Sequence, residues 1–415
     1  MIYLKKLFLY SAFYILCVIP YIISSTNFSS NNEYINKGNI KRSIEEINNF
    51  KYDNKITNNL STNNRKKREI IKSQYKWTSP IYYQVDVSLN YRFIKKAIRI
   101  LETSTCFRFV YISLSKNHFS GIKFVSSSKC YAYLGKKFEK GLQVIGIGNE
   151  CLSLGGITHM ILRTLGIIYQ HCRIDRDVFI KVFPENIAAE YMEDFQILPK
   201  SKIKHLSLPY EYGSVMHFGM QTGSKNRGYT LMPKDHLYEN TVGQLDYPTF
   251  NDIKALNLHY CSKICKYTLI CKNHGYQDPN DCGKCICIDG FAGAICGYMA
   301  KRVIICGQKK MIARDKPTYH KITGNKYCVY HLKSINRKKI QLVILKINME
   351  PKYFLKCQMN RSFEVKYWKD KSLTGARFCH QKFSKIIISH NNYIILHYRS
   401  SDPRNYVYFY YKEIP

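Results

Sequence analysis

The chain has 415 residues, of which 64 are Lys or Arg and 29 are Asp or Glu, so its formal net charge is +35. This length allows two or three domains, each with its own core, and excludes a small peptide-like scaffold. The positive charge raises the question of a polyanionic partner. Lys, Asn, Ile and Tyr are abundant throughout the chain, however, which indicates a general compositional bias and does not favour nucleic acid as a partner.

Residues 1–25 have the layout of a secretory signal peptide. Lys5 and Lys6 precede the apolar run 7–23, and two serines follow it. The run is marginally long enough to span a bilayer, so a signal anchor is the alternative. No later stretch is apolar enough to span a membrane. We therefore expect a secreted, extracellular protein with no transmembrane span once the signal is removed.

The exported chain is predicted to be processed and oxidised. Residues 26–68 form a predicted pro-segment that ends in the basic processing site Arg65-Lys66-Lys67-Arg68. Of the 16 cysteines, Cys17 lies in the signal, which leaves an odd number and one unpaired thiol. Export would also make the sequons at Asn27, Asn59 and Asn360 available for glycosylation.

The pattern becomes globular from about Trp77 onward. Residues 81–85 read as a strand, and the next segment carries apolar residues at helical spacing, namely Ile94, Ala97, Ile98 and Leu101. Further strands are predicted over residues 107–113 and 121–126, and an edge strand over residues 144–148. A later helix is predicted from the shared face of Ile253, Leu256 and Tyr260, with Asn251 or Thr249 as its cap.

One segment has the frame of a zinc-protease helix. Read forward from His159, such a site needs Glu at the next position, a second His four residues on, Gly at the seventh and a third His at the tenth. Those positions hold Met160, Arg163, Gly166 and Tyr169. Two His at i and i+4 lie on one helix face and can share a metal ion. Only His159 and Gly166 keep the pattern.

Two further motifs follow in order. Arg173 and the triplet Asp175-Arg176-Asp177 continue the segment, and about forty residues later the chain reads Tyr-Gly-Ser-Val-Met-His-Phe, ending at Phe218. Together the motifs resemble the astacin family of secreted zinc endopeptidases, in which the last position of the Met-turn is a Tyr that adds a metal ligand. The resemblance implies an α+β fold, with a two-lobed metzincin domain over residues 69–261.

The resemblance also assigns roles to single residues. Gly166 lets the chain turn, Met216 belongs to the Met-turn, and His217 is a buried support of that turn. His159 is expected to be a hydrogen-bonded helix residue. Gln170 replaces a Glu that, in active members, receives the buried mature amino terminus, so this ion pair cannot form here.

Two disulfides are implied by the same resemblance. Cys106 is expected to pair with Cys261, and Cys130 with Cys151. Closing the long first loop would constrain the unfolded chain by roughly 4 to 5 kcal/mol in the entropic model. Cys172 is then the unpaired thiol.

Residues 262–297 contain six cysteines in a stretch too short for an apolar core, and they resemble an EGF-like module. A small zinc site is the alternative, because Cys282, Cys285 and Cys287 are tightly spaced. In an exported chain we expect disulfides instead. Six cysteines permit fifteen connectivities, and the sequence does not select one.

Residues 306–415 carry short alternating strands, for example 341–345 and 406–411, which predict a β-sandwich. This region resembles a CUB domain, with a Thr-Gly-Ala-Arg-Phe-Cys segment at 374–379 and two local cysteine pairs, Cys306–Cys328 and Cys357–Cys379. Some CUB domains bind calcium through acidic loop residues, and no convincing set is present here. We expect partner binding without a named ion.

The replaced residues remove the chemistry of a hydrolytic zinc site. Such a site binds a water, lowers its pKa and needs a carboxylate to take the proton. Met160 accepts no proton, which removes a contribution of typically 10² to 10⁴ in rate. Arg163 stays charged, and at about 4 Å it would repel a metal cation by roughly 4 kcal/mol per unit charge at an effective dielectric near 20. Zinc, the cofactor of the family, is predicted to bind weakly or not at all.

The sequence therefore predicts a catalytically inactive astacin homologue, a pseudoprotease that binds extracellular proteins or peptides. An active zinc endopeptidase is the first alternative, and it requires His159, His171 and Cys172 to form a rearranged site. A matrix or adhesion protein held to acidic glycans by its basic charge is the second.

Overall fold

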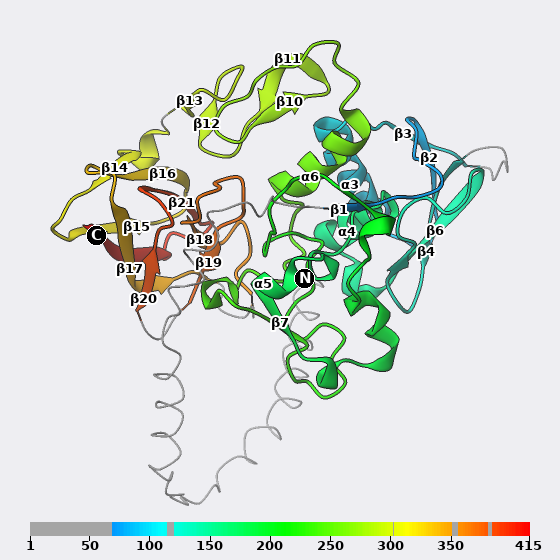
Figure 1. Cartoon of the computed structure of the whole chain (residues 1–415), viewed down its shortest axis with the longest axis horizontal. Coiled ribbons are helices and arrows are strands. Elements are labelled where there is room, and N and C mark those ends of the chain that lie inside the picture. Colours follow the sequence, from blue (N-terminus) through cyan, green and yellow to red (C-terminus); the bar gives the residue numbers. More distant parts are fainter. Residues whose placement is uncertain (1–68, 114–119, 302, 351–355, 381–383) are drawn as a thin grey trace, which may run out of the picture. The chain divides into compact units, whose positions relative to one another are not determined.

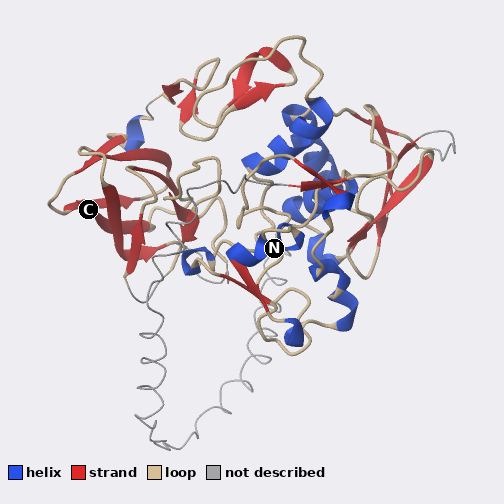
Figure 2. Cartoon of the chain, viewed as in Figure 1, coloured by secondary structure: helices blue, strands red, loops and turns tan. Residues whose placement is uncertain are grey.

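The computed structural model describes residues 69–113, 120–301, 303–350, 356–380 and 384–415. The signal peptide, pro-segment and processing site predicted within 1–68 lie outside this part. Among the described residues, no helix is long and apolar enough to cross a membrane. Helices and strands alternate up to about residue 261, and strands and loops predominate after it (Figure 1, Figure 2).

A five-stranded sheet has the order β3-β2-β4-β6-β5. Its first four strands are parallel, and β5 pairs antiparallel with β6. The strand bounds are Ile81–Val85 (β2), Phe109–Tyr111 (β3), Ser120–Ser126 (β4), Tyr131–Ala132 (β5) and Gly141–Ile147 (β6). The strand predicted over 81–85 is confirmed, and the one over 121–126 is longer by one residue. The one over 107–113 is shortened to Phe109–Tyr111.

The prediction of an edge strand over residues 144–148 is wrong in one respect. Residues 144–147 belong to β6, but Tyr131 and Ala132 of β5 pair with Gly146 and Ile145, so β5 occupies the edge of the sheet. A two-residue strand has too few positions to show an alternating pattern, which is why sequence periodicity does not reveal it.

Helix α3, Tyr91–Ser104, begins at Asn90, whose side chain accepts a hydrogen bond from the Arg92 backbone N–H. Its buried residues are the four predicted from helical spacing: Ile94, Ala97, Ile98 and Leu101. They share a core with the sheet, and α3 also packs against the central helix.

The central helix, α4, spans Leu154–Thr164 and is capped by Ser153, whose Oγ accepts a hydrogen bond from Gly156 N at 3.0 Å. Nine of its eleven residues are buried, so it has no broad solvent face. A helix enclosed in this way must satisfy its polar side chains within the protein.

The part of the chain between α4 and Cys261 has short elements. One two-stranded sheet pairs β1 (Glu69–Ile71) with β8 (Ile203–His205), and another pairs β7 (Ile180–Val182) with β9 (Leu231–Pro233). The helices are α5 (Arg176–Phe179) and α6 (Phe250–Leu256).

The structure decides between the two caps, Asn251 and Thr249, that were predicted for helix α6. Thr249 is the N-cap and forms a capping box with Asp252, so the alternative cap, Asn251, lies inside the helix. Ile253 and Leu256 are buried as predicted. Tyr260 lies in the π-helical turn that follows and donates a hydrogen bond to the Leu165 carbonyl at 2.8 Å.

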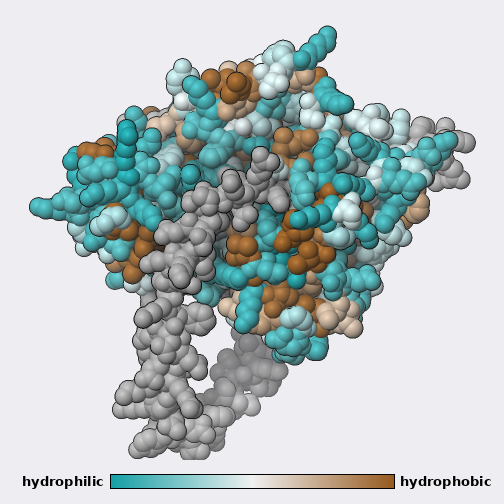
Figure 3. All heavy atoms as spheres, viewed as in Figure 1, coloured by the Kyte–Doolittle hydropathy of each residue, from teal (hydrophilic) through white to brown (hydrophobic). Residues whose placement is uncertain are grey.

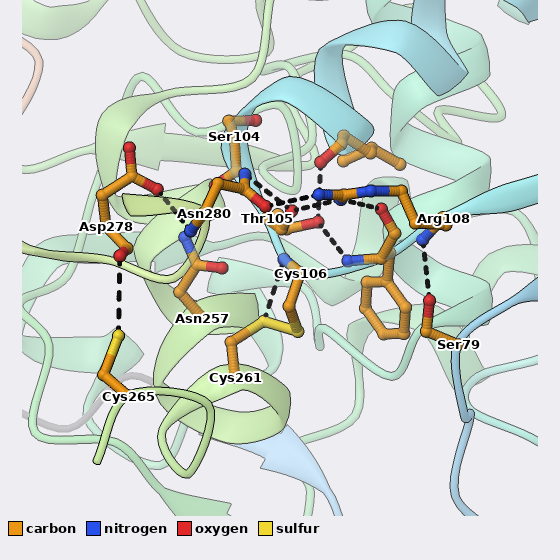
Figure 4. The surroundings of a disulfide bond; sticks show 12 residues. Ser79, Ser104, Thr105, Cys106, Arg108, Asn257, Cys261, Cys265, Asp278 and Asn280 are labelled. Atoms are coloured by element: carbon orange, nitrogen blue, oxygen red, sulfur yellow. Dashed lines mark hydrogen bonds between the residues drawn. A yellow bond between two sulfur atoms is a disulfide. The ribbon is translucent and has the colours of Figure 1, made fainter. Parts of the chain in front are cut away.

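The Cys106–Cys261 disulfide joins the end of α3 to that turn. Figure 4 shows that Asn280, from the following segment, reaches this junction. Asn280 Nδ2 donates to the Thr105 carbonyl at 3.0 Å, and its Oδ1 accepts from Arg108 Nη2 at 2.7 Å. The next part of the chain is thus tied to the disulfide by polar contacts.

The six-cysteine segment (residues 262–297) and the short stretch after it contain two small antiparallel sheets, β10 (Tyr276–Asp278) with β11 (Asp281–Ile286) and β12 (Phe291–Ala292) with β13 (Tyr298–Met299). Its disulfides are Cys265–Cys282, Cys271–Cys285 and Cys287–Cys296. The three closely spaced cysteines considered as zinc ligands are therefore all in disulfides.

The C-terminal part (residues 306–415), called the sandwich below, consists of two sheets with the strand orders β14-β16-β21-β18-β19 and β15-β22-β17-β20. The bounds are Lys310–Ala313 (β14), Thr318–Thr323 (β15), Tyr327–Ser334 (β16), Lys339–Asn348 (β17), Ser362–Lys366 (β18), Ala376–Phe378 (β19), Lys385–Ile388 (β20), Tyr393–Arg399 (β21) and Tyr406–Ile414 (β22). Residues of both sheets share one core. The predicted β-sandwich is thus the observed arrangement.

The remaining disulfides join the pairs expected from the sequence, Cys130–Cys151, Cys306–Cys328 and Cys357–Cys379. Cys172 is a free, buried thiol.

The sandwich contacts the region of residues 69–261 through a buried carboxylate. Glu211 accepts hydrogen bonds from Thr374 N at 3.1 Å and Thr374 Oγ1 at 2.8 Å, and also from Thr249 Oγ1 at 3.0 Å. Tyr238 Oη donates to the Thr374 carbonyl at 3.2 Å. The core around Tyr210 and Tyr238 is continuous with that of the sandwich.

Replacing Cys106 and Cys261 together by Ser should destabilise the protein more than replacing Cys130 and Cys151. The loops span 155 and 21 residues, and the chain-entropy model gives about 5 and about 3 kcal/mol, respectively. Urea denaturation of both double variants measures the difference. A larger loss from the shorter loop would contradict this account.

Acid should weaken the sandwich through His331, whose Nε2 lies 3.1 Å from the Gly290 carbonyl. Burial lowers the pKa of His331 to about 4 from 6.5, so the unfolded chain binds more protons between these values and stability falls as pH drops from 6.5 to 4. His331→Gln should reduce this pH dependence by about 1 to 3 kcal/mol. Thermal unfolding between pH 7 and 4.5 measures it, and an unchanged pH dependence would contradict the assignment.

Candidate functional site

The residues at the zinc-helix positions lie in the C-terminal half of α4 and in the turn that follows it. His159 and Arg163 are one helical turn apart on α4, and Gly166 follows the helix with φ +93°. A side chain is disfavoured there because of this φ and because a Cβ would approach Ile71 Cγ2 to 3.0 Å. The turn at Gly166 carries the chain back so that Tyr169 meets His159.

His159 is held by the Met-turn. Its Nδ1 lies 2.6 Å from the Val215 carbonyl, and burial lowers its pKa to about 4. The ring is therefore neutral at pH 7, with Nδ1–H as the donor to Val215. The expected role of His159 as a hydrogen-bonded helix residue agrees with this contact.

Four rings form a continuous series, called the ring column below. Tyr169 stacks on His159 with centroids 5.3 Å apart and on His171 at 5.1 Å. Phe218 stacks on His171 at 4.2 Å. Burial raises the pKa of Tyr169 above its ordinary value, so its hydroxyl keeps its proton. The column thus joins His159, the retained ligand position, to Tyr169 and Phe218, which replace two other ligands.

Arg163 packs over the Tyr169 ring of the ring column. Its Cζ lies 4.4 Å from the Tyr169 ring centroid, a cation–π geometry. Its Nη2 lies 3.0 Å from Asp194 Oδ1, and its Nε donates to the Ala132 carbonyl at 3.0 Å. The guanidinium therefore has an ion pair, a backbone acceptor and an aromatic face.

Asp194 also organises the residues of the alternative metal site. Its backbone carbonyl lies 3.0 Å from His171 Nε2 and accepts a hydrogen bond from the Cys172 thiol at 2.8 Å. His171 Nδ1 accepts from Phe218 N at 3.3 Å. Burial raises the pKa of Cys172 to about 12, so the thiol stays protonated at neutral pH.

Two observations oppose a rearranged metal site. The Tyr169 ring packs against both His159 and His171, and both nitrogens of His171 already have partners. Over the described ranges, no group of three or more His, Cys, Asp or Glu residues is arranged to hold a metal ion.

The remaining site residues are buried, and they pack in the core or make hydrogen bonds within the protein. Met160 and Met216 belong to the core of the astacin-like region. His217 Nε2 lies 2.7 Å from Tyr210 Oη, and its Nδ1 lies 2.8 Å from the Phe218 carbonyl. His217 is therefore a buried support of the Met-turn, as expected.

Gln170 makes polar contacts with the same turn. Its backbone N–H donates to the Met216 carbonyl at 2.8 Å, and its Oε1 accepts from Glu211 N at 3.2 Å. Both contacts tie Gln170 to the segment around the Met-turn. Gln170 Nε2 is buried without a hydrogen-bond partner among the described residues. A neutral amide thus occupies the position where the family has a carboxylate.

Sequence reasoning missed Asp194 and the Val215 carbonyl. Asp194 lies 31 residues from Arg163 in a short 3₁₀ turn, Glu193–Phe195, and no local pattern marks it. The only available signal was physical, because a guanidinium removed from water requires a carboxylate or several carbonyl groups.

Part of the chain is similar to known proteins. The model of the family described as Astacin (Peptidase family M12A) matches residues 69–261. Zinc metalloproteinase nas-34 of Caenorhabditis elegans is 30% identical over 328 residues, which cover 78% of this chain and 53% of that protein. Zinc metalloproteinase nas-23 of the same organism is 32% identical over 260 residues, covering 60% and 48%.

A solved structure is also similar. High choriolytic enzyme 1, a hatching enzyme zinc-protease from Oryzias latipes, is 27% identical with a TM-score of 0.39, covering 46% of this chain and 96% of that one. The chain spans about half the length of the curated relatives named above. The matched residues, 69–261, include α4, the turn at Gly166 and the Met-turn, so this part of the chain is similar to the astacin family.

Proposed function

We propose that this chain is a secreted astacin homologue without peptidase activity, which acts by binding extracellular proteins or peptides. The observation that carries the proposal is the ring column with Arg163 packed against it. The positions that would hold the family's zinc are filled by side chains that contact one another, and they form no set of ligands around a shared centre.

The residues present do not fit zinc. Protein zinc sites use His, Cys or carboxylate ligands, commonly three or four of them. Here His159 is the one retained ligand, and Arg163 brings a fixed positive charge within 4.4 Å of the Tyr169 ring centre. A cation between these groups would displace the Tyr169 ring and meet the guanidinium charge.

The general base is also missing. In a hydrolytic site a carboxylate must reach the water that attacks the peptide bond. Met160 occupies that position and packs in the core. The active endopeptidase with a rearranged site is disfavoured because His171 and the Cys172 thiol already have hydrogen-bond partners and Tyr169 packs against both His159 and His171.

The binding role is proposed for a chain of several modules. We assign residues 1–25 to a signal peptide, 26–68 to a pro-segment, 69–261 to the astacin-like domain, 262–297 to an EGF-like module and 306–415 to a CUB-like domain. Three disulfides in the six-cysteine segment and two packed sheets in the sandwich support the last two assignments. The disulfides also support an extracellular location.

The secreted, disulfide-intact protein should contain close to zero zinc per chain after dialysis against trace zinc, and it should not cleave denatured casein. Elemental analysis and a chelator-controlled cleavage assay measure the two properties. The variant Met160→Glu/Arg163→His/Tyr169→His/Phe218→Tyr should gain zinc, because it restores three His, the Tyr and the base.

The matched control is Met160→Glu alone, which adds the base without ligands and should remain free of zinc. About one zinc per wild-type chain, or chelator-sensitive cleavage by it, would overturn the proposal.

Arg163→Gln should destabilise the protein by about 1 to 3 kcal/mol, because it leaves the partly buried Asp194 carboxylate without its ion pair. Arg92→Gln removes the same charge from an exposed position on α3 and should change stability by less than about 0.5 kcal/mol. Urea denaturation compares the two variants. Equal effects would show that Arg163 has no special structural role.

A further inference from the structure

The outer face of the four-stranded sheet of the sandwich carries a row of tyrosines. Along β22, Val407, Phe409 and Tyr411 are buried, so the alternating residues Tyr406, Tyr408 and Tyr410 lie on the opposite face. This outer surface, made by β15, β22, β17 and β20, is called the tyrosine face below.

The neighbouring strand β15 continues the row. Tyr319 is paired in register with Tyr410, and Lys321 with Tyr408. The Tyr319 ring lies 5.4 Å from that of Tyr410 and 6.1 Å from that of Tyr408, centroid to centroid. Lys321 Nζ lies 5.9 Å from the Tyr406 ring centroid. Aromatic rings and an ammonium group are therefore interleaved.

The charged side chains of these four strands are mostly positive. The four strands contain five lysines, Lys321, Lys339, Lys346, Lys385 and Lys412, and one acidic residue, Glu413. Glu413 faces the buried side, where its carboxylate accepts hydrogen bonds from Ser334 Oγ and from Asn336. Lys385 is paired with Ile344, which faces the core, so four of the five lysines lie on the tyrosine face, and no carboxylate within these described strands offsets them.

Packing alone explains only part of this surface. Cross-strand aromatic pairs stabilise sheets, and they account for the ring contacts. They do not require lysines beside the rings, nor do they require Tyr319 to be 58% exposed. In the view of Figure 3, hydrophobic residues form separate patches on a mainly hydrophilic surface. An ordered row of rings with lysines is more specific than such scattered patches.

We propose that the tyrosine face binds an acidic polysaccharide. Tyr rings present flat apolar faces to the C–H faces of sugar rings, and Lys ammonium groups pair with sulfate or carboxylate groups along the same chain. The rings of β22 are partly covered and end in hydroxyls, so they suit contact with a polar polymer better than insertion into hydrocarbon. The inference does not depend on whether the astacin-like domain binds zinc.

The test measures binding of a heparin octasaccharide to the full chain across a salt series. Lys321→Gln/Lys346→Gln/Lys412→Gln should weaken binding by about tenfold near physiological salt and reduce the salt slope by about two to three. The matched control is Lys95→Gln/Lys96→Gln/Arg99→Gln, which removes three exposed charges from α3 and should have a much smaller effect. Equal losses in both triple variants would mean that binding depends on diffuse charge, and would overturn the proposal.

A second variant separates sugar stacking from charge. Tyr319→Thr removes the ring but leaves a residue that suits a strand on β15, and it should weaken binding of the octasaccharide while leaving binding of inorganic polyphosphate unchanged. Equal loss for both probes would overturn the stacking contact. Lysine-dependent binding to phosphatidylserine vesicles, without binding to the octasaccharide, would overturn the polysaccharide in favour of a membrane surface.

Discussion

Helix α4 is buried on almost every side, and this burial constrains the whole astacin-like domain. A polar side chain on such a helix has no access to bulk water and must find its partner inside the protein. In a metalloprotease a metal ion meets that need for several side chains at once. Here His159 is satisfied by the Val215 carbonyl, and Arg163 by Asp194, Ala132 and the Tyr169 ring.

The replacements are therefore mutually consistent. Arg163 needs a carboxylate and an aromatic face, and Asp194 and Tyr169 supply them. Tyr169 in turn needs flat neighbours, which His159 and His171 provide. Returning one of these positions to a zinc ligand would leave the others mismatched. The site is a packed unit with its own internal contacts.

Much of the local structure could be predicted from the residues. The 3.6-residue spacing of Ile94, Ala97, Ile98 and Leu101 was sufficient for α3, because a long amphipathic helix carries a strong signal. The position of β5 could not be predicted, since two residues carry no periodicity. The disulfide connectivity of the six-cysteine segment depends on how its hairpins fold, and cysteine spacing alone does not determine it.

The candidate site, too, could be predicted only in part. Which ligands were lost could be read directly from the motif, because the spacing of zinc ligands follows helix geometry. What replaced the metal could not be read, because Asp194 and Val215 reach the site from distant loops. The same holds for Thr374, whose contact with Glu211 links the sandwich to the Met-turn segment across 163 positions of the chain.

The buried thiol of Cys172 bears on how the chain acquires its disulfides. Thiol–disulfide exchange requires a thiolate, and a thiol with a pKa of about 12 is almost entirely protonated at neutral pH. Once the core around Asp194 has formed, Cys172 is both enclosed and unreactive. Before that point it can compete with the other cysteines for partners. If this core forms before the disulfides, it removes Cys172 from the pool of thiols that can mispair.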